Sequence, residues 1–235
     1  MDAGNLARLN DARRARKAVA LITNLDSGRD LVVIEGEVVS APLRDAVEAA
    51  FRSGKSVGVD VDGGRYFVNV HLPPANIVII GAVHISQALA RMAALAGFDV
   101  RIIDPRTAFA TPERFAGIDL VADWPADILE DHPLDAYTAV VAVSHDPKID
   151  DFPIAEALRT GCFYVGALGS RKTQAARLER LRGLGFDEVS LARISGPIGL
   201  DIGAASPAEI AVAVLAEIIQ TLRFRDVTSP KGDTG

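Results

Sequence analysis

Several side chains that can bind a ligand or move a proton follow directly after apolar segments of the chain. They are His84, Asp104, Arg106, His145 and Asp146. Imidazole and carboxylate groups can act as general acids or bases, and guanidinium groups bind oxyanions. Because a parallel sheet brings the carboxyl ends of its strands to one edge, we expect these groups to share one crevice. Two plainer interpretations stay open: Asp104 pairs with Arg106, and His145-Asp146 is a capping pair.

The elements that must position the first three of these side chains form a predicted βαβ unit. Ile77–Ile80 is a β-branched run typical of a buried parallel strand, and Gly81 ends it. A helical apolar period follows, and Val100–Ile103 forms the next strand. Asp104 comes 23 positions after Gly81, close to the roughly 20 positions of a dinucleotide-binding unit.

The glycine pattern of this unit departs from the dinucleotide fingerprint G-x-G-x-x-G. Its three positions hold Gly81, Val83 and Ser86. The second glycine normally lets the backbone approach a pyrophosphate, and a valine side chain obstructs that approach. NAD(P) is therefore only an alternative ligand, and a buried βαβ unit that binds nothing is another.

Two further glycine-rich segments precede predicted helices. Gly166 and Gly169 lead to Ser170-Arg171, where an N-cap, free amides and cations suit a phosphate or another oxyanion, although a plain helix cap explains them nearly as well. The loop before the helix that starts at Ser206-Pro207 contains glycines able to approach a ligand closely. Gly199 and Asp201 lie in this second loop.

Composition excludes several classes of protein. Of 235 residues, 49% are hydrophobic and 24% are charged, as in an ordinary globular protein, and the net charge of −6 argues against nucleic-acid binding. No apolar run approaches the roughly 18 residues of a membrane span, and the polar start lacks a secretory signal, so we expect a cytoplasmic protein without stable membrane insertion. The single cysteine, Cys162, excludes an internal disulfide and is expected to be a buried small side chain. We predict no metal site.

The alternation of strands and helices predicts an α/β fold, a Rossmann-like doubly wound parallel sheet with a small N-terminal α+β domain. The pair Pro73-Pro74 marks the expected boundary. We expect an N-terminal domain over 1–73, a Rossmann-like domain over 74–224 and a disordered tail over 225–235. We also expect a poorly anchored polar helix over 1–17, a short helix over Ala108–Arg114 and a helix over Pro153–Thr160.

Four segments together resemble the XdhC/CoxI family of accessory proteins for molybdenum hydroxylases. They are IVIIGAVHISQALARMAALAGFDVRIIDPR, VSHDPKIDDFPIAEAL, YVGALGSRKT and PIGLDIGAASPAEIAVAVLAEII, and the resemblance covers roughly residues 70–222. It implies a non-catalytic maturation factor that binds molybdenum cofactor of the molybdopterin type and supports its insertion into an apo-enzyme such as xanthine dehydrogenase. It also implies a homodimer and contact with a sulfurtransferase. The ligand-binding positions that it implies are His84, Asp104, Arg106, His145, Asp146, Gly166, Gly169, Ser170, Arg171, Gly199 and Asp201. We add Gly81, from the first turn, to this set.

The chain departs from the family pattern in two places. Val83 stands where family members usually have glycine, and the segment Val33–Ser40 lacks the cysteine that they typically carry near the N-terminus. Since a thiolate is the natural soft ligand for molybdenum or carrier of sulfur, direct sulfur handling is not implied here. Two rival functions stay open: an NAD(P)-dependent oxidoreductase and a nucleotide-sensing regulatory domain. Ser144-His145-Asp146 is contiguous along the chain, so these side chains cannot converge as a catalytic triad.

Overall fold

The computed structural model describes residues 2–225, which divide into two compact units. One contains the residues up to Pro73 together with those from Arg223 onward, and the other runs from Pro74 to Leu222. Each unit is described by itself. Apart from Arg225, the tail expected over 225–235 lies outside the described residues. No helix within the described part of the chain is long and apolar enough to cross a membrane.

The larger unit is built on a parallel sheet of six strands in the order β10-β9-β8-β5-β6-β7. The strands are β5 (Asn76–Ile80), β6 (Asp99–Ile103), β7 (Asp119–Val121), β8 (Thr138–Ala142), β9 (Tyr164–Ala167) and β10 (Ile194–Ser195). The chain adds β6 and β7 on one side of β5 and then returns to add β8, β9 and β10 on the other. This reversal places a topological switch point between β5 and β8, and it confirms the predicted doubly wound parallel sheet.

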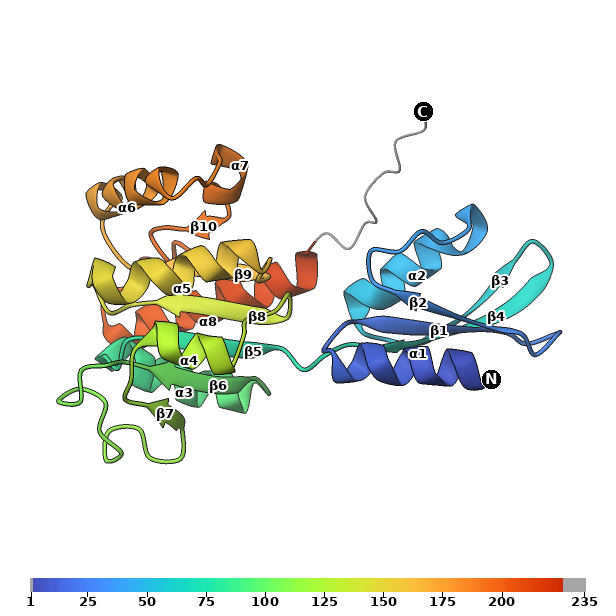
Figure 1. The fold of residues 1–235 in the computed structure, drawn as a ribbon, viewed down its shortest axis with the longest axis horizontal. Coiled ribbons are helices and arrows are strands. Elements are labelled where there is room, and N and C mark those ends of the chain that lie inside the picture. Colours follow the sequence, from blue (N-terminus) through green and yellow to red (C-terminus); the bar gives the residue numbers. More distant parts are fainter. Residues whose placement is uncertain (1, 226–235) are drawn as a thin grey trace. The chain divides into compact units, whose positions relative to one another are not determined.

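Helices cover both faces of this sheet (Figure 1). On one face, α3 (His84–Leu95) and α8 (Pro207–Phe224) enclose an apolar cluster with Ile77 and Ile79 of β5. On the other face pack α4 (Pro125–Asp131), α5 (Pro147–Arg159), α6 (Arg171–Gly183) and α7 (Glu188–Leu191), around the cluster that contains Val78 and Ile80. Neighbouring residues of β5 thus point to opposite, fully covered faces, which explains its unbroken apolar run.

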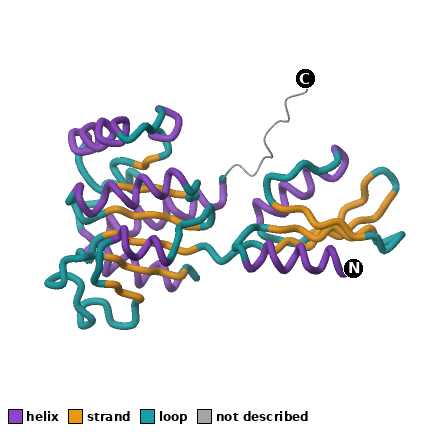
Figure 2. Tube along the Cα trace, in the orientation of Figure 1, coloured by secondary structure: helices purple, strands orange, loops and turns teal. Residues whose placement is uncertain are grey.

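The smaller unit has an antiparallel sheet in the order β2-β1-β4-β3. Its strands are β1 (Val19–Asn24), β2 (Asp30–Ile34), β3 (Val57–Val61) and β4 (Gly64–His71), and its helices are α1 (Ala3–Arg14) and α2 (Ala41–Ser53). Figure 2 shows the strands of this unit between the two helices. The expectation of a poorly anchored first helix is wrong: Leu9 and Ala12 of α1 are buried against Val19 and Val32.

The short helix expected over Ala108–Arg114 is absent, and this segment forms turns instead. Pro112 has no amide hydrogen to donate within a helix and disfavours a helical conformation of the residue before it. In addition, the Arg114 guanidinium donates to the carbonyl of Phe109 at 2.7 Å. A side chain therefore binds a carbonyl that a helix would use for its own ladder.

The helix expected over Pro153–Thr160 begins earlier, at Pro147, and forms α5. Asp146 is its N-cap and accepts a hydrogen bond from the Lys148 amide at 3.0 Å, and proline is well suited to the first helical position. Pro153 lies inside the helix. The strong start signal at Asp146-Pro147 outweighs the lost hydrogen bond of an interior proline.

Candidate functional site at the carboxyl edge of the parallel sheet

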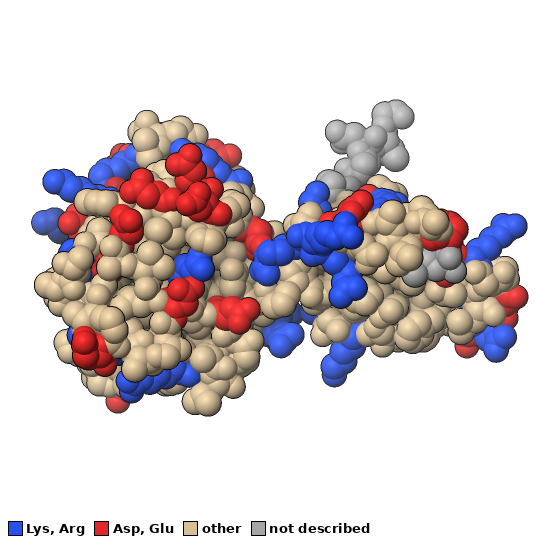
Figure 3. Space-filling model, turned by 60° about the horizontal axis from the view of Figure 1, so that its bottom comes forward, with Lys and Arg blue, Asp and Glu red and all other residues tan. Residues whose placement is uncertain are grey.

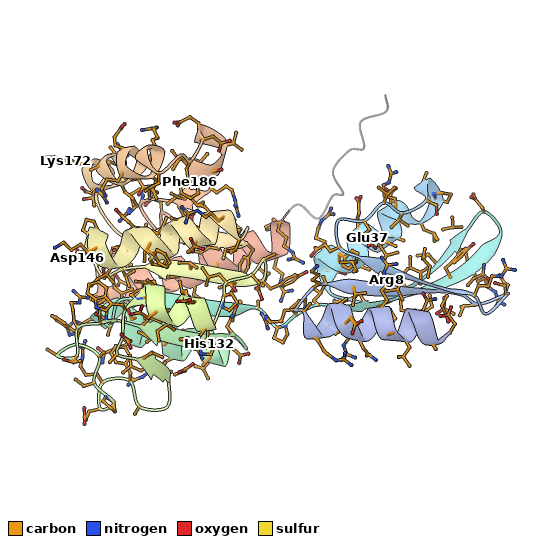
Figure 4. All side chains as sticks on the ribbon, viewed as in Figure 1. Arg8, Glu37, His132, Asp146, Lys172 and Phe186 are labelled. Atoms are coloured by element: carbon orange, nitrogen blue, oxygen red, sulfur yellow. The ribbon has the colours of Figure 1, made fainter. Side chains whose placement is uncertain are left out.

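Six strands end at the carboxyl edge of the parallel sheet, and the loop segments after five of them carry most of the predicted site residues. These segments are residues 81–83, 104–106, 144–146, 168–170 and 196–206. Figure 4 shows Asp146 and Lys172, from the loop before α5 and the start of α6, on the same side of the larger unit. The sheet thus brings residues from distant parts of the sequence to one edge.

Gly81 lies at the switch point, where the ends of β5 and β8 meet. Its φ is +114°, and a Cβ atom added there would lie 2.8 Å from the Ser144 amide nitrogen. Real Cβ atoms essentially never approach backbone atoms this closely. The glycine is therefore required by the contact between two strand ends, without any ligand.

The backbone amides of the turn after Gly81 donate hydrogen bonds to side chains of the protein. The Ala82 amide donates to Asp104 Oδ2 at 2.7 Å, and the Val83 amide donates to the Ser86 hydroxyl at 3.4 Å. The Ser86 hydroxyl in turn donates to the Gly81 carbonyl at 2.5 Å. Ser86, at the third fingerprint position, therefore closes the turn, and these amides are not directed at a pyrophosphate.

Asp104 is fully buried and fully bonded at the end of β6. Its Oδ1 accepts hydrogen bonds from the Arg106 amide and from Arg106 Nε, both at 2.9 Å. Its Oδ2 accepts hydrogen bonds from the Ala82 amide at 2.7 Å and from Arg106 Nη2 at 2.8 Å. Burial raises the pKa of this carboxyl, but the hydrogen bonds from Arg106 and Ala82 outweigh it and hold the pKa below its ordinary value. Four bonds fill the lone-pair sites of a carboxylate. The pairing of Asp104 with Arg106, left open by the sequence, is what the structure contains.

Arg106 keeps part of its guanidinium at the surface. The side chain is 30% exposed, its Nη1 lies 3.5 Å from the Ser144 carbonyl, and its guanidinium stacks 4.7 Å from the centre of the Phe109 ring. Hydrogen bonding to Asp104 holds the pKa of Arg106 above its ordinary value. The result is a permanent cation fixed at the switch point, able to face an anionic ligand.

The two histidines at this edge are exposed, and Asp146 has a structural role. His84 is the first residue of α3, and His145 has a positive φ of 67° in the loop after β8. Asp146 caps α5, so the capping interpretation holds for its carboxylate. The imidazoles of His84 and His145 are therefore the groups that solvent and ligands can reach.

The loop before α6 has the form predicted for an oxyanion site. Ser170 caps the helix by accepting the Thr173 amide at 3.2 Å, and Arg171 and Lys172 are exposed in the first turn. Gly166 differs from the prediction, because it lies within β9 and is buried. A Cβ added there would meet the Tyr164 and Ile198 side chains, so close packing requires glycine at this position.

A hydrogen-bond network with Glu217 of α8 and Tyr164 of β9 anchors the loop before α8. The Gly199 amide donates to Glu217 Oε2 at 2.8 Å, and the Tyr164 hydroxyl donates to the same oxygen at 2.5 Å. Burial and the bond to Glu217 raise the pKa of Tyr164 far above its ordinary value, so its hydroxyl stays protonated. Asp201 lies exposed on this loop.

Sequence reasoning missed three residues that shape this edge, namely Arg114, Asp150 and Arg177. Arg114 Nη1 donates to the Ala82 carbonyl at 3.1 Å. Asp150 and Arg177 are buried beneath the loops after β8 and β9. Asp150 follows Asp146 by four positions, one helical turn, which is the signal that could have found it. Arg114 reaches Ala82 from 32 positions away and Arg177 reaches Leu168 from nine, and no local pattern signals these two contacts.

The arrangement combines cations with two exposed imidazoles. Arg171 and Lys172 are exposed cations, Arg106 is partly exposed, and the imidazoles are those of His84 and His145. Lys and Arg side chains project from this end of the larger unit in Figure 3. Residues 2–225 contain no group of three or more potential metal-ligating side chains. Burial raises the pKa of Cys162 to about 11, so its sulfur is a thiol at neutral pH. The edge is thus suited to an anionic organic ligand.

A groove of about 420 Å³ lies between α4 and α5, and its wall includes Leu129, Phe152 and Glu156. None of the predicted site residues lines it.

The family model of the XdhC Rossmann domain matches residues 77–218, well over half of the chain. The chain belongs to the XdhC family. The expected resemblance is thereby confirmed, and the matched residues include all five loops of the carboxyl edge.

Several curated proteins are similar to this XdhC chain. It is 29% identical over 219 residues to a probable xanthine dehydrogenase subunit of Bacillus subtilis, covering 91% of this chain and 64% of the relative. It is 31% identical over 147 residues to the "Molybdenum cofactor insertion chaperone PaoD" of Escherichia coli, covering 62% and 40%. "Uncharacterized protein YqeB" of Escherichia coli is 33% identical over 171 residues, covering 70% and 31%. The chain therefore spans less than two thirds of the length of each of these relatives.

A solved structure shares the fold. A crystal structure described as a xanthine dehydrogenase from Bacillus halodurans superposes with a TM-score of 0.63 at 22% identity, covering 97% of this chain and 66% of that one. At this identity the likeness concerns the fold alone.

Proposed function

We propose that this XdhC chain binds molybdenum cofactor at the carboxyl edge of its parallel sheet and assists insertion of the cofactor into a molybdenum hydroxylase. The observation that carries this proposal is the group of Arg171, Lys172 and the partly exposed Arg106 at that edge, in a family whose relatives include a protein named as a molybdenum cofactor insertion chaperone. Molybdopterin is a phosphorylated pterin, so a cationic edge matches its charge.

The residues present fit such a ligand in a specific way. Arg171 and the amides of the first turn of α6 suit the phosphate, because a helix N-terminus and a cation both favour anions. Arg106, fixed by Asp104, and the imidazoles of His84 and His145 would contact the remainder. Gly199 and Asp201 would border the ligand from the loop before α8.

The same residues fit a dinucleotide less well. Asp104, which would bind the ribose hydroxyls in such a site, already has four hydrogen-bond partners. The Ala82 and Val83 amides are used inside the turn. NAD(P) therefore serves as the comparison ligand.

We further propose that the chain carries the cofactor without catalysing a reaction. Cys162 is buried with a raised pKa and cannot supply a thiolate at the carboxyl edge. Sulfuration would then depend on a separate sulfurtransferase, and transfer would depend on contact with the apo-hydroxylase. A homodimer in the cytoplasm completes the proposal.

A binding titration tests the proposal. Purified protein is titrated with molybdenum cofactor and, in parallel, with NAD(H) and NADP(H). We expect saturable binding of the molybdenum cofactor, lost or weakened at least about tenfold in Arg171→Ala, because a charged hydrogen bond contributes about 1.5–3 kcal/mol. Arg91→Ala on α3 removes an exposed cation from the same unit and should bind as the unchanged protein does. Binding of nicotinamide nucleotides alone would refute the proposal.

A further inference from the structure

Two charged residues lie buried beneath the loops after β8 and β9. Asp150 on α5 is 1% exposed, and Arg177 on α6 is 2% exposed. Charged side chains are almost never this buried unless they are paired, because removing a charge from water is unfavourable. Neither is needed for the apolar packing of the two clusters, so their position calls for another explanation.

Asp150 holds the loop after β8. Its Oδ1 accepts the Ser144 amide at 3.3 Å, and the Ser144 hydroxyl and the His145 amide also interact favourably with this carboxylate. His145 has its positive φ in this loop, directly beside the bonded amide of Ser144. A carboxylate anion thus fixes the backbone that presents one of the exposed imidazoles.

Arg177 holds the loop after β9. Its Nη2 donates to the Leu168 carbonyl at 3.0 Å, and its Nη1 donates to Gln174 Oε1 at 2.5 Å. The Gln174 side chain lies against Gly196, where an added Cβ would be 2.4 Å from its Cδ atom. One guanidinium therefore contacts the end of β9 directly and the end of β10 through Gln174. Its Nε is buried without a hydrogen-bond partner.

The charges of these two residues attract each other and have few other partners. Asp150 attracts Arg177, and so does Asp151, which is itself paired with Arg180 at the surface. Arg106, from the end of β6, also attracts Asp150. Arg180 repels Arg177, and Asp146 attracts Arg106 as Asp150 does.

Burial raises the pKa of Asp150 to about 6, although hydrogen bonds from Ser144 and attraction by Arg177 oppose the rise. Burial also lowers the pKa of Arg177. A modest fall in pH from neutral therefore adds a proton to Asp150 while Arg177 stays charged.

We propose that Asp150 and Arg177 are positioning residues of the carboxyl edge, which hold the loops 144–146 and 168–170 in their ligand-receiving arrangement. A charged acceptor binds an amide about twice as strongly as a neutral one does. Replacing the Asp150 carboxylate by a neutral amide therefore weakens the bond to Ser144 and removes the carboxylate that attracts the buried Arg177 cation most strongly. The positioning role depends on the proposed function only for the identity of the ligand that these loops receive.

The sign of the effect on binding separates positioning from simple electrostatics. Neutralising an acid near an anionic ligand should strengthen binding by Coulomb's law alone. If Asp150 acts by positioning the loops, neutralising it weakens binding instead.

Amide hydrogen exchange of the ligand-free, full-length protein tests the proposal directly. Exchange of the unchanged protein and of Asp150→Asn is compared at about pH 7.5, where the carboxyl of the unchanged protein is ionised. We expect protection in loops 144–146 and 168–170 to be about tenfold lower in Asp150→Asn, the ratio for a loss of about 1.4 kcal/mol.

Two variants assign the effect to the named residues. Glu156→Gln, which neutralises a carboxylate of the same helix paired with Arg159, should show the same loop protection as the unchanged protein. Arg177→Lys keeps the positive charge that attracts Asp150 but cannot donate to both Gln174 and the Leu168 carbonyl as the guanidinium does. Only loop 168–170 should therefore loosen at neutral pH. Because burial disfavours the charged form of Asp150, Asp150→Asn should unfold at the same or a higher urea concentration. Equal protection in Asp150→Asn and the unchanged protein would contradict the proposal.

A binding measurement with molybdenum cofactor separates the two proposals. Asp150→Asn is expected to bind about tenfold more weakly at neutral pH, by the same loss of ordering. If Asp150→Asn has loosened loops but the unchanged protein binds no cofactor, the proposed function fails and the positioning role stands. If it binds cofactor and Asp150→Asn binds equally or more tightly, the positioning role fails and the proposed function stands.

Discussion

At the scale of single residues, Gly81 shows how a position that resembles a ligand-binding glycine can be fixed by packing. Gly81→Ala should lower the free energy of unfolding by about 3 kcal/mol or more, because the new Cβ would meet the Ser144 backbone and alanine disfavours a positive φ. Urea unfolding measures this change.

Gly97→Ala is the matched control for this substitution. Gly97 also has a positive φ, of 87°, but nothing lies within 4 Å of its added Cβ. We expect it to lose only the conformational term, about 1–2 kcal/mol. Equal losses in the two variants would show that the contact with Ser144 contributes nothing.

The buried carboxylate of Asp104 leads to a prediction about stability and pH. Asp104→Asn removes the charge that binds Arg106 and should lower the free energy of unfolding by about 2–3 kcal/mol at neutral pH. Because the pKa of Asp104 is lowered in the folded protein, this stabilisation is present above the ordinary value of 3.8 and is lost as pH falls through the lowered value. The difference between the two proteins should therefore be constant from about pH 6 to 8 and shrink below about pH 4.

Asp119→Asn controls for a surface ion pair in the neighbouring strand. Asp119 pairs with Arg101 at 2.7 Å, but its side chain is 50% exposed. Exposed pairs contribute about 0–1 kcal/mol, so this variant should unfold close to the unchanged protein. A loss as large as that of Asp104→Asn would mean that burial of Asp104 is not what makes its pairing strong.

At the scale of elements, Glu217 of α8 holds the loop that precedes this helix, by accepting hydrogen bonds from Gly199 and Tyr164. Glu217→Gln should lower the free energy of unfolding by about 1–3 kcal/mol, because the amide cannot accept from both Tyr164 and Gly199 as strongly as the carboxylate does. Amide exchange of loop 196–206 should rise in the same variant, which mass spectrometry can measure.

Gln220→Ala tests whether this effect is specific. Gln220 is exposed on the same helix, and alanine favours helices, so stability and loop exchange should stay unchanged. If Glu217→Gln destabilises the protein without faster exchange of loop 196–206, its role is limited to the helix and the core.

At the scale of the whole molecule, the larger unit should fold by itself. Both of its apolar clusters are built entirely from residues 77–218, so no side chain of the smaller unit is needed to complete them. A chain of residues 74–224 is expected to unfold in one cooperative transition and to retain binding of molybdenum cofactor. Circular dichroism during urea unfolding checks the first expectation, and the titration above checks the second. A gradual, non-cooperative loss of structure would contradict it.

The sequence by itself determined the fold class, the family and the segments that form the carboxyl edge. Apolar periods, glycine turns and helix caps are local signals, so strands such as β5 and helices such as α8 follow from them directly. Strand ends in a parallel sheet must meet at one edge, so the common location of His84, Asp104 and His145 followed as well. Their role in ligand binding stays a prediction.

Only the tertiary structure decided what these side chains do to one another. The contacts of Gly81 with Ser144, of Arg114 with Ala82 and of Arg177 with Leu168 join residues that lie on different elements. Such contacts depend on how far each loop extends and where each side chain points, which no local pattern encodes. The missing helix over Ala108–Arg114 has a partly local cause in Pro112, and Arg114 is in addition held by a carbonyl of the distant β5 turn. The burial of Asp150 and Arg177 likewise exists only once α5 and α6 pack over the ends of β8 and β9.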